Sequence, residues 1–125
     1  NVLLATTEQC SKEHIQKLED RGVEVWKSSP QQVDLKRLLQ YLAEKGCLQV
    51  LVEGGARLHS AFWREHLVNA GVIYWGPKFL GDQGSPMLRD LQLCLDNAEH
   101  VKITKTFLVG DSVKTCFECV GREDG

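Results

Sequence analysis

The sequence predicts an α/β fold, in which a mostly parallel sheet is flanked by helices and a C-terminal antiparallel hairpin closes the sheet. Short apolar runs alternate with amphipathic segments of helical spacing from residue 2 to residue 75. Two runs rich in β-branched and aromatic residues, 101–108 and 112–120, then stand on either side of Gly110-Asp111, which is typical of a hairpin. Crossovers between parallel strands are right-handed, so we expect helices over the sheet faces.

The first half of the chain is predicted to contain two strands and two helices. Ser11 and Asp34 stand where the helices should begin, and their side-chain oxygens can accept from free N–H groups there. Gly22 and Gly46 stand where the helices should end, because glycine readily adopts the left-handed conformation that closes a helix. The expected elements are strands at 2–5 and 23–26 and helices at about 11–21 and 34–46.

The middle of the chain contains the stretch around which the fold is expected to be organised. Residues 48–52 are predicted to form a buried strand, because Val50, Leu51 and Val52 form an apolar run. Gly54-Gly55 breaks this strand, and helical spacing of apolar residues begins at about Ala56. The following elements are expected to be a helix to about 65, a strand at 72–75 and a loop at 76–86 rich in glycine and proline.

The Gly54-Gly55 turn is a candidate ligand site. A glycine turn that opens a helix presents free N–H groups and the positive end of the helix dipole, which suit a phosphate. Glu53 supports this interpretation, because a carboxylate that ends an apolar strand needs solvent or a partner, as in a cleft. The alternative is that the two glycines form only a tight connection between strand and helix.

The composition argues against several classes of protein. A net charge of −2 and a pI near 6.1 give no electrostatic footprint for nucleic acid. No apolar run approaches the roughly 18 residues of a membrane helix, and the start shows no signal-peptide pattern. The chain enters a strand at once, so we expect a preceding segment to be missing. Five scattered cysteines are expected to be reduced thiols of a cytoplasmic protein.

Other candidate chemistry is weak, and no metal site is predicted. Cys116 and Cys119 lie three residues apart in a predicted strand, so they should point to opposite faces. His59 and His66 are better explained as surface histidines than as metal ligands. Ser60 lacks the Gly-x-Ser-x-Gly setting of a hydrolase nucleophile.

The order of these residues resembles a specific family: the reductase domain of the bifunctional riboflavin-biosynthesis pyrimidine deaminase/reductase. The resemblance extends over almost the whole chain. Its most specific part is Val-Glu-Gly-Gly-Ala at 52–56 together with Pro-Lys-Phe-Leu-Gly at 77–81. Supporting matches lie at 3–7, 33–35, 39, 42–43, 50–51, 62 and 67–68.

The resemblance implies a dihydrofolate-reductase-like fold and an activity. The implied reaction is the NADPH-dependent reduction of 5-amino-6-(5-phosphoribosylamino)uracil, with direct hydride transfer to ribose C1′. It also implies a cytoplasmic homodimer, with a zinc-dependent deaminase domain upstream in the natural polypeptide. Glu53 matches the acid that contacts and orients the substrate. The matching cofactor segment consists of Gly54, Gly55, Ala56, Arg57, Leu58, His59, Ser60 and Ala61.

Departures from the family pattern leave two alternatives open. Asn69-Ala70-Gly71 stands where the family has an acidic pair, and Trp75-Gly76 replaces a small apolar pair. One alternative is therefore a reductase-like binding or regulatory domain without catalysis. The other is an NADPH-dependent reductase of a different heterocycle. The family's first strands would precede Asn1, so we expect a preceding segment or a partner chain to cover part of the sheet.

Overall fold

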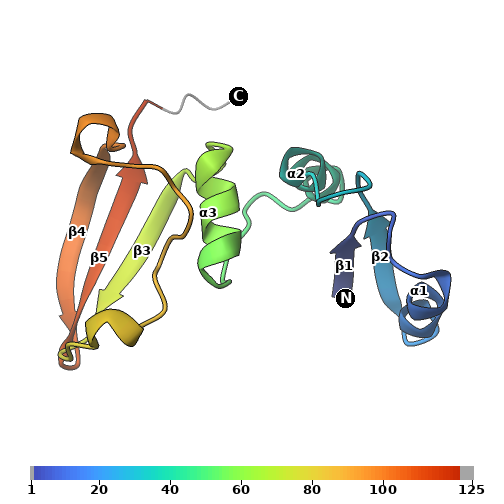
Figure 1. The fold of residues 1–125 in the computed structure, drawn as a ribbon, viewed down its shortest axis with the longest axis horizontal. Helices are drawn as coiled ribbons and strands as arrows, with labels where there is room; N and C mark the ends of the chain where they lie inside the picture. Colours follow the sequence, from blue (N-terminus) through green and yellow to red (C-terminus); the bar gives the residue numbers. More distant parts are fainter. Residues whose placement is uncertain (1, 122–125) are drawn as a thin grey trace. The chain divides into compact units, whose positions relative to one another are not determined.

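A computed structural model describes residues 2–121, which divide into two compact units on either side of the Leu51–Val52 bond. Figure 1 shows the order of the elements along the chain. In the first unit, β1 and β2 pair in parallel from Val2 opposite Val23 to Thr6 opposite Lys27. The elements of this unit are β1 (Val2–Thr6), α1 (Lys12–Glu19), β2 (Val23–Lys27) and α2 (Leu35–Glu44).

Both helices of the first unit begin and end where the sequence predicts. Ser11 accepts a hydrogen bond from the His14 N–H at 3.3 Å, and Asp34 caps α2 in the same manner. Gly22 and Gly46 follow the helices with φ of 78° and 86°, the left-handed conformation expected there. The predicted β-α-β-α order of residues 2–46 is therefore confirmed.

A polar cluster connects α2 with β2 in the first unit. The Tyr41 hydroxyl donates to Glu24 Oε1, and Lys45 Nζ lies 2.7 Å from Oε1 and 2.8 Å from Oε2 of the same carboxylate. The Tyr41 ring also lies 5.8 Å from the Trp26 ring, centroid to centroid. The Lys45 ammonium holds the pKa of Glu24 below its ordinary value, assisted by the Tyr41 hydroxyl.

The second unit is a helix beside a three-stranded antiparallel sheet of order β3-β5-β4 (Figure 1). β4 and β5 form the predicted C-terminal hairpin, and Gly110 has the positive φ of 63° that its turn requires. Its elements are α3 (Ala56–Arg64), β3 (Ala70–Trp75), the short 3₁₀ helices Gly81–Gln83 and Leu95–Asn97, β4 (Val101–Val109) and β5 (Ser112–Cys119).

The core of the second unit lies between α3 and the sheet. Phe62 and Phe117 are buried, and the Trp63 ring lies 6.3 Å from the Phe117 ring. Gly71 is paired with Phe117 across β3 and β5. A Cβ atom at Gly71 would come within 2.3 Å of the Phe117 ring, so glycine makes room for that ring.

One predicted element is not formed. Residues 48–52 form no strand, and Leu48 and Leu51 are 100% and 82% exposed. A strand exists only by hydrogen bonding to a neighbour, and no described strand pairs with these residues. The α/β class holds, but parallel pairing among residues 2–121 is confined to β1 and β2.

The helices of residues 2–121 are short compared with the thickness of a lipid bilayer. None of them combines the length and the apolar character needed to cross a membrane.

Candidate functional site

The Gly54-Gly55 turn leads directly into α3, as predicted. A Cβ atom at Gly54 would lie 2.6 Å from Leu58 Cδ2, so the Leu58 side chain occupies the space that a larger residue would need. The Gly54 N–H donates to His59 Nε2 at 3.3 Å. The turn therefore lies against Leu58 and is hydrogen-bonded to His59, both of the helix that follows it.

Gly55 is the N-cap residue of α3, and its surroundings are open. No side chain caps this end of the helix, and a Cβ atom at Gly55 would meet no other atom within 4 Å. The first N–H groups of a helix have no partner within the helix. Free backbone N–H groups and the helix dipole at such an open N-terminus both favour an anion.

Glu53 and Arg57 flank this turn, and both are exposed. Solvation of the Glu53 carboxylate agrees with the expectation that it does not enter the core. Ala56 and Ala61 are half-buried members of α3, and Leu58 is 41% exposed although it contacts the turn. The predicted site residues from 53 to 61 thus lie on one continuous turn and helix.

Ser60 differs from its neighbours because it is turned into the interior. It is 1% exposed, and its Oγ accepts a hydrogen bond from the Arg89 N–H at 2.7 Å. The Ser60 hydroxyl therefore anchors the loop between β3 and β4 to α3. This contact across 29 positions could not be read from the sequence.

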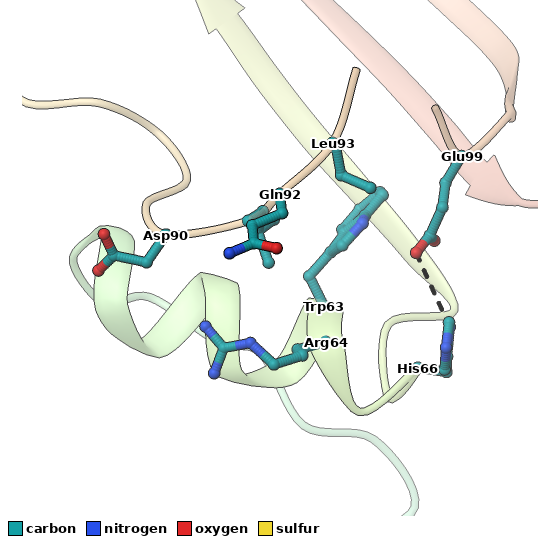
Figure 2. A pocket seen from close by; sticks show the side chains of 8 residues that line it. Trp63, Arg64, His66, Asp90, Gln92, Leu93 and Glu99 are labelled. Carbon is teal, nitrogen blue, oxygen red and sulfur yellow. Dashed lines mark ion pairs between the residues drawn. The ribbon is translucent and has the colours of Figure 1, made fainter. Parts of the chain in front are cut away.

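A cavity of about 400 Å³ lies at the opposite, C-terminal end of α3 (Figure 2). None of the predicted site residues lines it. In Figure 2 the Trp63 indole points toward Leu93, and Gln92 lies to its left. Two lining residues lie near each other, with His66 Nδ1 3.9 Å from Glu99 Oε1. The lining residues are Trp63, Arg64, His66, Asp90, Leu91, Gln92, Leu93 and Glu99.

Two of the cavity residues have an unusual backbone. His66 and Asp90 have φ of 58° and 56°, in the left-handed region that few non-glycine residues adopt, although His and Asp adopt it more readily than most. At His66 this conformation closes α3, because the Leu67 N–H donates to the Phe62 carbonyl at 2.9 Å. No glycine in the sequence marks this end of the helix, so its left-handed closure could not be predicted.

Metal ligation finds no support among the described residues. Within 2–121, no three side chains of His, Cys, Asp or Glu are grouped so that they could hold an ion. Cys116 and Cys119 lie three positions apart in β5.

The chain matches one protein family along most of its length. Residues 1–114 match the family described as the RibD C-terminal domain. Riboflavin biosynthesis protein RibD of Chlamydia trachomatis serovar D is 76% identical over 123 residues, which are 98% of this chain and 33% of that protein. The 2,5-diamino-6-ribosylamino-4(3H)-pyrimidinone 5′-phosphate reductase of Aquifex aeolicus is 30% identical, covering 96% of this chain and 54% of that protein.

Solved structures agree with these sequence matches. Acinetobacter baumannii RibD, form 2, is similar with a TM-score of 0.77 and 25% identity, over 93% of this chain and 31% of that chain. A pyrimidine reductase-like protein of Corynebacterium diphtheriae has a TM-score of 0.79 at 16% identity, over 94% of this chain and 50% of that chain, which shows the shared fold alone. The chain spans about a third of the RibD proteins that it matches.

Proposed function

The chain belongs to the RibD C-terminal domain family, and we propose that it is part of an NADPH-dependent reductase of riboflavin biosynthesis. The proposed substrate is a phosphoribosylaminopyrimidine, whose ribosylamino group becomes a ribitylamino group. The names of the relatives support this activity, since RibD and a ribosylaminopyrimidinone phosphate reductase are among them. NADPH is proposed as the reductant.

The observation that carries the proposal is the open N-terminus of α3 behind two glycines. Gly55 leaves the first N–H groups of the helix without a side-chain cap. These groups would bind a phosphate of NADPH, and the absence of a side chain at Gly55 allows close approach. When bound, the nicotinamide supplies a hydride from its C4 atom.

The residues of the chain would bind and orient in this reaction. Glu53 directly precedes the glycine turn and is exposed. Its carboxylate can accept hydrogen bonds from polar groups of the substrate, which would hold C1′ of the opened ribose near the nicotinamide. Holding two reactants in contact is the main requirement of a direct hydride transfer.

An NADPH titration tests the proposal, with energy transfer from tryptophan to the nicotinamide as the readout and NADH as the comparison. Gly55→Asp is expected to abolish saturable binding. A carboxylate at the N-cap would accept from the free N–H groups and repel a phosphate, while it stabilises the helix by about 0.5–1 kcal/mol. Lost binding with an intact helix would therefore report on the phosphate site.

Gly76→Asp is the matched control. Gly76 is exposed and would meet no atom within 4 Å, so the same charge is added away from the turn. We expect NADPH binding to remain unchanged. Equal binding by wild type and Gly55→Asp would contradict the proposed phosphate site. No binding by this chain or by the longer natural polypeptide would contradict the reductase proposal.

The second candidate is a domain that binds the cofactor without turnover. It is motivated by Asn69-Ala70-Gly71 in place of an acidic pair. The structure gives this segment another role: the Asn69 carbonyl accepts from the Cys119 N–H at 2.8 Å, and Gly71 accommodates Phe117. Packing against Phe117 thus accounts for the glycine at position 71. Saturable NADPH binding without product from any pyrimidine in a substrate panel would favour the alternative.

The natural polypeptide is proposed to be a cytoplasmic homodimer with an upstream deaminase domain. This proposal rests on the family resemblance and on the length of the RibD relatives, of which the chain spans about a third. Light scattering of the full polypeptide would measure its oligomeric state.

A further inference from the structure

His59 forms two contacts with the glycine turn. Its Nε2 atom accepts from the Gly54 N–H at 3.3 Å, and its own backbone N–H donates to the Gly55 carbonyl at 3.3 Å. The residue is half-buried, in contrast to the exposed Arg57 one half-turn earlier. The imidazole therefore lies against the turn.

The donor in the side-chain contact determines the state of the ring. A backbone N–H can only donate, so His59 Nε2 must present a lone pair. A neutral imidazole with one accepting nitrogen carries its hydrogen on the other, which is Nδ1 here. A doubly protonated ring has no acceptor and would lose the bond to Gly54.

We infer that His59 is a positioning residue of the proposed cofactor site. Its side chain holds Gly54, so that Gly55 and the first turn of α3 keep their N–H groups open. The inference rests on the proposed function, and it assigns His59 an indirect role where the family resemblance implies membership of the cofactor segment. In this arrangement the imidazole contacts the glycine turn, and the backbone of the turn would contact the phosphate of the cofactor.

The physical reason lies in the freedom of glycine. Two consecutive glycines can adopt many backbone conformations, of which few leave the N–H groups aligned for an anion. A bond from Gly54 to His59 favours the aligned turn before the ligand arrives. A site that is already ordered loses less entropy on binding and so binds more tightly.

The test compares two substitutions of similar size. His59→Gln keeps an acceptor close to the position of Nε2, whereas His59→Leu removes the acceptor and retains a good helix former. In His59→Leu we expect faster hydrogen exchange at the Gly54 amide without cofactor, and an NADPH Kd about fivefold higher, as loss of one ordinary hydrogen bond implies. His59→Gln should restore both quantities towards wild type.

Further readouts separate the possible failures. Nitrogen NMR of wild type should show His59 with hydrogen on Nδ1, and circular dichroism should show equal helix content in all variants. If hydrogen exchange at the Gly54 amide were unchanged in His59→Leu, the hydrogen bond from Gly54 to His59 would be contradicted. If the Gly54 amide exchanged faster in His59→Leu but the NADPH Kd were unchanged, the positioning role of His59 would be contradicted. The proposed cofactor site would then remain. If neither the wild-type chain nor the longer natural polypeptide bound NADPH, the proposed function would be overturned, and the positioning role with it.

Discussion

At the residue scale, neighbouring positions of the proposed site have different tasks. Glu53 is exposed beside the turn, whereas Ser60 is buried and holds the loop at Arg89. His59 holds the Gly54 amide. A polar residue in this segment can therefore be available to bind a ligand, or it can hydrogen-bond to the backbone around the site. The hydrogen bonds of its side chain distinguish the two roles.

Glu53→Gln is expected to lower kcat by a factor of about 100 or more, while the NADPH Kd changes little. The amide keeps the shape of the carboxylate but loses its charge, which should act on the substrate rather than on the cofactor. Turnover and cofactor titration on the same preparation measure the two effects. Glu44→Gln, an exposed position of α2, is the control, and equal turnover in Glu53→Gln and wild type would remove Glu53 from the site.

At the element scale, single residues determine how a helix or strand packs against its neighbour. Gly71 lets the Phe117 ring of the central strand lie close to β3, where Phe117 also meets Trp63 of α3. In the first unit, Glu24 of β2 accepts from Tyr41 and Lys45, which belong to α2 and its C-cap. One connection depends on the absence of a side chain, and the other on charge.

Gly71→Ala is expected to lower the free energy of unfolding by about 1–3 kcal/mol, because the added methyl group overlaps the Phe117 ring. Denaturant unfolding followed by tryptophan fluorescence measures the loss. Gly76→Ala is the control, since a Cβ atom there meets nothing within 4 Å. A Gly71→Ala variant as stable as wild type would show that Phe117 can move without cost.

The Glu24 cluster is expected to make stability depend on pH. The Lys45 ammonium, with the Tyr41 hydroxyl, holds the pKa of Glu24 below its ordinary 4.5. Glu24 thus stabilises the folded state above pH 4.5 and loses this contribution as pH falls through its lowered pKa. The hydrogen bond to Glu24 raises the pKa of Lys45 above 10.5. Lys45 thus contributes fully below pH 10.5 and loses its contribution as pH rises through the raised pKa.

Glu24→Gln should therefore be less stable than wild type from about pH 5 to 10, and the difference should shrink below pH 4.5. Thermal unfolding across this pH range measures the difference. Glu44→Gln removes an exposed carboxylate from α2 and should follow the wild-type profile. A difference between wild type and Glu24→Gln that is constant down to pH 2 would contradict the assignment.

At the scale of the whole molecule, each of the two units has its own sheet and helices. The first unit contains the parallel strand pair, and the second contains the antiparallel sheet with the proposed cofactor turn. Residues 48–51, all exposed, end the first unit, and Val52 begins the second. The apolar composition of residues 48–52 suits a strand that is paired on both sides, which the described residues do not provide.

The sequence by itself determined the three α-helices, three of the predicted strands and the hairpin, because caps, glycines and hydrophobic spacing act within a few residues. The resemblance of residues 52–56 and 77–81 likewise indicated the family, which the comparisons confirm. Only the tertiary structure decided that residues 48–52 stay unpaired, that Ser60 faces Arg89 and that His66 faces Glu99. These outcomes depend on which segments, distant in the sequence, come into contact in space, and local sequence patterns do not predict such contacts.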